Sequence, residues 1–190
     1  IFKPNLNKIN KRNSNDFNKI KDCNIIFICS SSATHFFYLD KLIGKKYIFC
    51  EKPPVTSRNE LLKLKKIINN KVFFNYNLRY CEISAFIEKA KKNNFGNLLY
   101  ANITLTHGLS SKKNYVTNWR SNKKLSPKGV FETVSIHALD LILYNFGIKR
   151  ILFQNLSNTS SKGTAYDTSH TTVVSKNNAK ISIFCSYNAP

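Results

Sequence analysis

Short apolar runs alternate with amphipathic stretches in the first half of the chain. The runs are rich in β-branched and aromatic side chains, which predicts strands buried on both faces, as in a parallel sheet. These runs occupy residues 25–29, 46–50 and 72–77. Between them, residues 35–43 and 57–68 carry apolar side chains at helical spacing, and Ser57 with Glu60 forms a capping box. The order strand, helix, strand, helix, strand predicts right-handed βαβ units.

The periodicity changes near residue 80. Long alternating runs predict strands of a one-sided sheet, and two amphipathic stretches predict helices. The predicted helices and strands are, in turn, residues 83–92 and 131–144, and residues 98–106, 151–158, 168–175 and 180–186. Asn177 and Asn178 fit a hairpin turn between the last two strands. The second half therefore predicts a helix packed on a mostly antiparallel sheet.

The net charge of +20 suggests a nucleic-acid or membrane partner, but its composition argues against one. It comes from 25 Lys and only 5 Arg, although Arg is the better bidentate ligand of phosphate and guanine. The lysines are spread along the chain, and Asn and Ile are also abundant, as A/T-rich codons would produce. We expect a solvated surface, with no nucleic acid and no membrane as partner. The polar residues 1–20 predict a surface segment.

The cysteines indicate a reducing compartment rather than a disulfide or metal framework. Their number is odd, no CxxC pair occurs, and their spacing with the four histidines fits no metal site. They are Cys23, Cys29, Cys50, Cys81 and Cys185. No apolar run is long enough to span a membrane, and no secretion signal opens the sequence. A cytoplasmic protein without a bound metal is expected.

Polar side chains follow the first two predicted strands at the point where a parallel sheet forms its ligand crevice. Glu51 and Lys52 come directly after the second strand, where partial burial could lower the pKa of a lysine toward a proton-transfer range. Pro53 restricts Lys52 to extended geometry. The serines of residues 30–32 follow the first strand and could hold a polar ligand. An exposed ion pair and ordinary helix capping are the alternative interpretations.

Two further places could carry chemistry in the second half. His137 lies in a predicted helix with Asp140 three residues later on the same face, which suits an acid/base or orienting pair. A structural histidine would also explain the pattern. Trp119 and Arg120 precede a polar loop and could clamp a ligand, or pack and solvate without one.

Four segments in this order resemble the Gfo/Idh/MocA family of oxidoreductases, over about residues 20–190. They resemble a Rossmann strand with its Thr-His turn, a Gly-Lys…Glu-Lys-Pro segment, an Asn-x-Arg-Phe crossover and a Trp-Arg…Gly-Gly…His-x-x-Asp stretch. In this sequence they are residues 24–30 with Thr34 and His35, residues 44–53, residues 77–80, and residues 118–120 with 129–130 and 137–140.

The resemblance implies an α/β fold, with a truncated Rossmann-type parallel sheet followed by an α+β domain that has a mostly antiparallel sheet. A partial dinucleotide-binding domain would span residues 1–78, and a substrate-binding and oligomerisation domain residues 79–190. It implies an oxidoreductase that transfers a hydride between NAD or NADP and a hydroxyl carbon of a sugar, nucleotide-sugar or polyol. A homo-oligomer is also expected.

The resemblance also implies roles for individual residues. Lys52 and His137 would be the catalytic groups, with Lys52 bonding the substrate hydroxyl that loses its proton. The expected cofactor-binding residues are Ser30, Ser31, His35, Glu51 and Lys52. The expected substrate-binding residues are Arg79, Trp119, Arg120 and Thr133.

The sequence departs from the family's pattern at three points. Thr133 stands four residues before His137, where the family usually has Asp, and Glu132 is its neighbour. Only Gly129 remains of the usual Gly pair. The G-x-G-x-x-G loop that holds a pyrophosphate, and the strand before it, are absent. We therefore expect a piece of a longer chain, cut at both ends, that binds dinucleotide poorly by itself.

Two other function classes stay open. A non-catalytic relative that binds a sugar or a partner protein would account for Thr133 and for the missing glycine loop. A nucleic-acid binder would account for the net charge, and its binding would weaken steeply with added salt.

Overall fold

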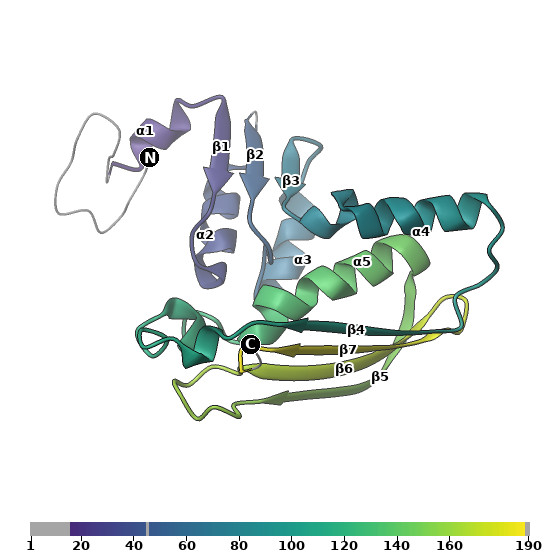
Figure 1. Cartoon of the computed structure of the whole chain (residues 1–190). Helices are drawn as coiled ribbons and strands as arrows, with labels where there is room; N and C mark the ends of the chain where they lie inside the picture. The colour runs from purple at the N-terminus through teal and green to yellow at the C-terminus, as the bar shows by residue number, and fades with distance from the viewer. Residues whose placement is uncertain (1–15, 45, 189–190) are drawn as a thin grey trace. The chain divides into compact units, whose positions relative to one another are not determined.

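The computed structural model describes residues 16–44 and 46–188, which divide into two compact units (Figure 1). Unit 1 holds the described residues up to Ser30 together with Thr34–Asn75, and unit 2 holds Ser31–Ala33 and the described residues from Tyr76 onward. Most of the predicted surface segment, residues 1–15, lies outside the described residues. Its last part includes the short helix α1 (Asn18–Lys21).

Unit 1 is built on a three-stranded parallel sheet. Its strands, in spatial order, are β1 (Ile25–Ile28), β2 (Tyr47–Cys50) and β3 (Val72–Phe74). The helices α2 (Ser32–Leu42) and α3 (Arg58–Ile67) connect them, as the sequence pattern predicts. The predicted capping box begins α3. The Ser57 hydroxyl accepts from the Glu60 N–H at 3.2 Å, and the Glu60 carboxylate accepts from the Ser57 N–H at 3.1 Å.

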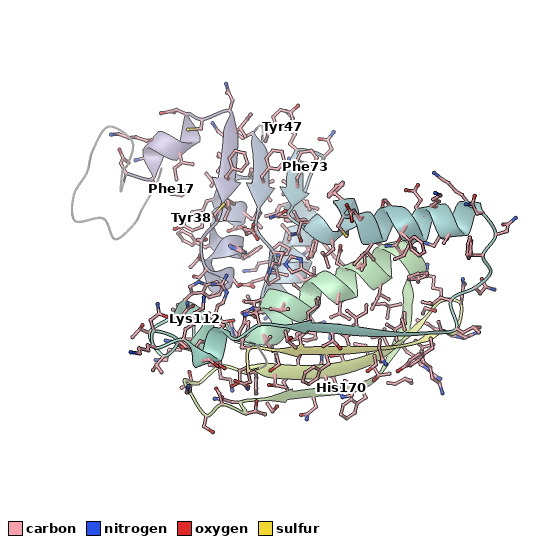
Figure 2. The ribbon with its side chains drawn as sticks, in the orientation of Figure 1. Phe17, Tyr38, Tyr47, Phe73, Lys112 and His170 are labelled. Atoms are coloured by element: carbon pink, nitrogen blue, oxygen red, sulfur yellow. The ribbon has the colours of Figure 1, made fainter. Side chains whose placement is uncertain are left out.

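Both helices of unit 1 cover the same face of the sheet. The buried side chains of that face and of the two helices form one apolar cluster, which comprises Ile26, Ile28, Leu39, Leu42, Ile48, Cys50 and Leu64. The opposite face is exposed: Phe27 is 69% accessible, and its ring stacks on Phe49, which stacks on Phe73 (centroids 5.2 and 5.1 Å). Figure 2 labels Tyr47 and Phe73 on these strands. The prediction that the strands are buried on both faces is therefore wrong for the described residues, because α2 and α3 pack on one side.

Unit 2 is a helix on a four-stranded sheet. The strands lie in the order β4 (Tyr100–Thr106), β7 (Lys180–Ser186), β6 (Thr168–Ser175) and β5 (Ile148–Ser157). β4 and β7 pair in parallel, whereas the other two pairs are antiparallel. The predicted hairpin turn joins β6 to β7, with Asn178 at a φ of 65°. The fold class expected from the sequence is confirmed.

The core of unit 2 lies between the sheet and one long helical segment. A π-helical turn, η4 (Phe131–Ser135), leads directly into α5 (Ile136–Phe146). Side chains of η4 and α5, of the inner sheet face and of the preceding loop share one cluster, whose buried members are Tyr115, Val130, Ala138, Ile142, Val173, Ile181, Ile183, Cys185 and Tyr187. The helix α4 (Glu82–Lys92) runs along α5, and the 3₁₀ turn η1 (Asn77–Tyr80) precedes it. No helix of the described part is long and apolar enough to span a membrane.

Candidate active site

The carboxyl ends of β1 and β2 bring two predicted site segments together in unit 1. The register pairs Ile28 with Cys50, and the Glu51 N–H donates to the Ile28 carbonyl at 2.9 Å, one residue beyond the strand end. Ser30 is exposed just past β1, where its hydroxyl accepts from Thr34 at 2.7 Å. The turn after β1 and the Glu51-Lys52 segment thus share one edge, because parallel neighbours end on the same side.

The buried side chain of His35 contacts both segments. Its side chain is 1% exposed, with Nδ1 2.7 Å from the Pro53 carbonyl oxygen and Nε2 2.9 Å from the Ser30 carbonyl oxygen. Both ring nitrogens are therefore engaged with backbone oxygens. His35 therefore connects the two segments of the edge, and its expected contact with the cofactor stays a prediction.

Glu51 and Lys52 are half-buried at this edge. The Glu51 carboxylate accepts from the Asn75 amide at 2.6 Å, which ties it to the segment after β3. Beneath them, burial raises the pKa of the Cys50 thiol to about 12, so this cysteine stays protonated and serves as an apolar core residue. Ser31, half-buried just before α2, belongs to unit 2 and is not counted with this edge. The edge therefore presents hydroxyl, carboxylate and ammonium groups, which suit a polar organic ligand.

In unit 2, Asp140 forms an ion pair with Arg79. The guanidinium donates from Nε at 2.7 Å and from Nη2 at 2.5 Å, one bond to each carboxylate oxygen. Asp140 is buried, and hydrogen bonding to it raises the pKa of Arg79. This pair fastens η1 to α5, and the role of Asp140 as the orienting carboxylate of His137 stays a prediction. Arg79, predicted to bind substrate, also lies over the rings of Tyr76 and Tyr144.

The Thr133 hydroxyl takes part in two hydrogen bonds whose directions can be assigned. Its hydroxyl contacts both the Gly129 carbonyl, at 2.9 Å, and the Tyr187 hydroxyl. Since a carbonyl only accepts, Thr133 donates to Gly129 and Tyr187 donates to Thr133. The positive charge of Arg120 lowers the pKa of Tyr187, against the larger raising effect of burial. Burial is the largest influence on Tyr187 and raises its pKa to about 12, which keeps the phenol protonated as the donor.

Glu132, the carboxylate next to Thr133, points elsewhere. It is 4% exposed and accepts from the Ser126 hydroxyl at 2.7 Å and from the Lys128 N–H at 3.2 Å. Gly129 allows this turn, since its φ is 54° and a Cβ there would lie 1.9 Å from the Tyr166 carbonyl oxygen. Glu132 therefore closes the loop before η4, and it does not replace the carboxylate that the resemblance leads one to expect at position 133.

Arg120 and Trp119 form the short turn η3 (Trp119–Ser121), which begins where the Asn118 side chain accepts from the Arg120 N–H at 3.0 Å. The guanidinium lies over the Trp119 ring, 4.4 Å from its centroid. His107, at the end of β4, packs its ring against Tyr187 with centroids 4.8 Å apart. Burial, followed by the charges of Arg120 and Lys112, lowers the pKa of His107 below its ordinary value.

The structure groups the predicted residues within each unit. In unit 1 it brings together Ser30, His35, Glu51 and Lys52. In unit 2 it brings Thr133 into contact with Tyr187, a residue that the sequence did not single out. Nothing in the local pattern marks Tyr187, since it follows an apolar strand like any core aromatic. His137 is half-buried in the first turn of α5, four residues after Thr133.

Among the described residues no group of three His, Cys, Asp or Glu side chains has the arrangement of a metal site. All five cysteines are free thiols, and two of them, Cys50 and Cys185, are buried. The predicted site residues themselves offer hydroxyls, an amine, a carboxylate, guanidinium groups and imidazoles.

A scan against protein-family models matches residues 85–190 to the GFO/IDH/MocA C-terminal domain. A search of the curated proteins found no match. Solved structures of similar fold include levoglucosan dehydrogenase in complex with NADH and levoglucosan, with a TM-score of 0.82 and 22% sequence identity. That match covers 93% of this chain and 52% of the other.

Two further similar structures come from named bacteria. An inositol dehydrogenase homolog complexed with NAD⁺ from Azotobacter vinelandii has a TM-score of 0.74 and 20% identity, covering 87% of this chain and 46% of its own. An NAD binding oxidoreductase from Klebsiella pneumoniae has a TM-score of 0.78 and 15% identity, covering 90% and 50%. At these identities the likeness is one of fold, and the chain spans about half the length of these proteins.

Proposed function

The chain belongs to the GFO/IDH/MocA family, and on this basis we propose that it acts in NAD(P)-dependent oxidation or reduction of a hydroxyl carbon in a sugar, nucleotide-sugar or polyol. The observation that carries the proposal is the shared edge of β1 and β2. There a lysine, a carboxylate and a serine hydroxyl meet at the carboxyl ends of parallel strands, where open α/β sheets bind their ligands. The names of the similar structures, which mention NADH, levoglucosan and inositol dehydrogenase, are consistent with it.

Lys52 is the proposed acid/base group of unit 1. Its ammonium would bond the substrate hydroxyl and take or return that proton as the carbon is oxidised or reduced. The backbone around it is fixed by the ladder bond at Glu51 and by the His35 contact to the Pro53 carbonyl. A fixed backbone on both sides of Lys52 limits the positions of its side chain, which favours proton transfer at one defined atom.

The residues present fit part of a nicotinamide dinucleotide. Ser30 offers a hydroxyl, and Glu51 offers a carboxylate, at the edge where the polar parts of a nicotinamide nucleotide would lie, and Ser31 remains a proposed cofactor contact. When bound, the nicotinamide would supply the hydride acceptor or donor. The sequence holds no G-x-G-x-x-G loop for the pyrophosphate, so these residues would hold only the nicotinamide end.

In unit 2, His137 is the proposed second acid/base group, and Arg120, Trp119 and Thr133 are proposed to contact substrate. The proposed role of Arg79 changes with its geometry. The Nε and Nη2 groups of Arg79 both donate to Asp140. Arg79 therefore holds η1 against α5 and positions the helix that carries His137.

A homo-oligomer is proposed from the outer face of the unit 2 sheet. Phe153 and Phe184 are exposed on this face, on either side of the His170 ring. A second copy of the chain that covers this face would bury them.

The hydride-transfer proposal is tested with the complete protein that contains this chain, NAD or NADP, and a panel of neutral and charged sugars and polyols. Substrate-dependent formation or consumption of reduced nicotinamide, followed by its absorbance, is the expected result. The second candidate function is a non-catalytic sugar-binding relative, which Thr133 favours because it is a hydroxyl in place of a carboxylate. Sugar binding by calorimetry without any change in reduced nicotinamide would support that candidate and contradict the first.

A further inference from the structure

The backbone of Tyr187 is anchored on both sides, one residue beyond the end of β7. Its N–H donates to the Asp167 carbonyl at 2.8 Å. Its carbonyl accepts from the Ser110 N–H at 3.0 Å and from the Ser110 hydroxyl at 2.8 Å. The residue is 0% exposed. Because both main-chain groups are bonded and the ring is enclosed by close packing, the phenol oxygen has a fixed position.

The Tyr187 hydroxyl is directed at the Thr133 hydroxyl. Thr133 donates its one hydroxyl proton to the Gly129 carbonyl at 2.9 Å, and its N–H donates to the same carbonyl at 3.2 Å. Tyr187 is therefore the donor in the bond between the two hydroxyls. A hydroxyl oxygen has two lone pairs, of which Tyr187 takes one. Thr133 is left with one acceptor position and no proton to donate.

Tyr115 shows that this bond is particular to Tyr187. The two rings pack edge to face with centroids 6.2 Å apart, and both residues are 0% exposed. The Tyr115 hydroxyl has no hydrogen-bond partner among the described residues. Both tyrosines thus fill the same apolar cluster with their rings, and they differ in the bond that Tyr187 makes to Thr133. Packing alone does not account for that bond, since a phenylalanine ring would fill the space as well.

The pair of hydroxyls lies close to a proposed acid/base group and to an exposed side chain. Thr133 belongs to the π-helical turn η4, and His137 follows four residues later, about one turn along the same helical segment. On the Tyr187 side, the exposed His107 packs its ring against the phenol with centroids 4.8 Å apart. Single π-helical turns within helices are frequent at functional sites. The free acceptor position of Thr133 therefore belongs to the part of unit 2 where a substrate is proposed to bind.

We propose that Tyr187 is a positioning residue that holds the Thr133 hydroxyl as an acceptor, so that position 133 binds a neutral hydroxyl group of the substrate. Such a hydroxyl donates to Thr133, whereas a carbonyl, carboxylate or phosphate oxygen would need a donor that Thr133 no longer has. This inference rests on the proposed function. It adds to that function a residue outside the predicted site and the kind of substrate group that position 133 selects.

The first test is steady-state kinetics of the complete protein with NAD or NADP and three neutral alcohols, glucose, galactose and myo-inositol. Tyr187→Phe should raise KM roughly fivefold, the weight of one neutral hydrogen bond, and should leave kcat within about twofold. KM alone changes because the bond is made equally to the ground state and the transition state. Tyr115→Phe is the matched control. It removes a hydroxyl without a partner in the described chain and should leave KM and kcat unchanged.

Variants at position 133 separate positioning from a general effect on folding. Thr133→Val removes the acceptor, so Tyr187→Phe should have no further effect on KM in that background. Thr133→Ser keeps the hydroxyl, so Tyr187→Phe should again raise KM roughly fivefold. A loss of folding would act alike in both backgrounds, whereas an effect through Thr133 is present in one and absent in the other. Urea unfolding of each variant checks that it is folded.

Monodeoxy derivatives of the best of the three alcohols identify the hydroxyl that Thr133 binds. Loss of that hydroxyl should raise KM in the wild type by roughly the same factor as Thr133→Val does, and it should have no further effect in Thr133→Val. If no deoxy position shows this dependence on Thr133, the selection of a hydroxyl donor is overturned.

The remaining outcomes separate this inference from the proposed function. A raised KM in Thr133→Val, with equal KM values in Tyr187→Phe and Tyr115→Phe, would overturn the role of Tyr187 and leave the proposed function in place. Additive effects of Tyr187→Phe and Thr133→Val would do the same, because Tyr187 would then act independently of Thr133. An absence of hydride transfer by the wild type with all three alcohols would contradict the proposed function, and the inference that depends on it would fall as well.

Discussion

The His35 imidazole lies 2.7 Å from the Pro53 carbonyl oxygen, and this contact connects the turn after β1 with the segment that carries Lys52. The second ring nitrogen faces the Ser30 carbonyl at 2.9 Å. A neutral imidazole has one N–H and donates to one of these two carbonyls. The buried ring, in contact with both segments, holds the two loops in one arrangement, because movement of either loop would break a contact.

Replacement of His35 should therefore cost stability. His35→Ala removes the imidazole from the buried Pro53 carbonyl and the part-buried Ser30 carbonyl and opens a cavity, so we expect a loss of about 2 kcal/mol in the free energy of unfolding. Urea unfolding measures it. His170→Ala is the control, because that histidine is exposed on β6 and should change the free energy by less than about 0.5 kcal/mol. Equal losses in the two variants would contradict the role assigned to His35.

The Arg79–Asp140 pair should matter more than the exposed pair of Glu88 and Lys92. Asp140→Asn leaves a partly buried guanidinium without its counter-charge, and we expect a loss of about 1–3 kcal/mol in the free energy of unfolding. Glu88→Gln breaks the Glu88–Lys92 pair, whose side chains are 67% and 73% exposed. That variant should lose no more than about 0.5 kcal/mol. Chemical denaturation of both variants compares them, and a larger loss in Glu88→Gln would be the opposite result.

Asp167 should make the stability of unit 2 sensitive to acid. Burial by itself raises the pKa of Asp167, but hydrogen bonds from Ser160 and Thr159 outweigh it, so its pKa lies below the ordinary value of 3.8. A lowered folded-state pKa stabilises the fold above the unfolded pKa, and that stability is lost as the pH falls from about 3.8 through the lower folded value. Unfolding measured across this range should show a shallower acid loss in Asp167→Asn than in the wild type. Identical slopes would mean that other carboxylates cause the acid loss.

The exposed aromatic row of unit 1 should promote self-association. Phe27, Phe49 and Phe73 stack along one sheet face, and apolar faces of this kind bind other surfaces or aggregate. Phe27→Ser should lower the association seen by light scattering with little change in unfolding free energy. Phe37→Ser, at an exposed position on α2, is the control for loss of a phenyl ring elsewhere. A variant that associates as strongly as the wild type would contradict this assignment.

The secondary structure was predictable because it depends on neighbouring residues. The capping box of Ser57 and Glu60 marks the start of α3 within four positions, and the apolar period separates strands from helices. Which faces of the parallel sheet are covered was not predictable. The same β-branched and aromatic composition suits a covered face and an exposed one, and only the positions of α2 and α3 decide which face is covered.

The site was predictable where it follows a strand, and not where it depends on contacts between distant segments. Glu51 and Lys52 come directly after β2, so their place at the sheet edge follows from the chain order. Asp140 pairs with a residue 61 positions away, and Thr133 contacts one 54 positions away. The sequence pattern favoured His137, three residues from Asp140, as its partner. It did not predict that Asp140 pairs with Arg79 or that Thr133 contacts Tyr187, because packing in unit 2 sets both contacts.

The proposed role of Lys52 is the central claim, and one comparison of turnover tests it most directly. Lys52→Ala and Lys63→Ala each remove one lysine, but Lys63 is exposed on α3, away from the edge. With NAD or NADP and an oxidisable sugar, Lys52→Ala should lower the rate of hydride transfer about a hundred- to ten-thousand-fold, the weight of one acid/base group, with unchanged unfolding free energy. Lys63→Ala should retain the wild-type rate. Equal rates in the two variants would show that Lys52 takes no part in proton transfer and would contradict the proposed function of this edge.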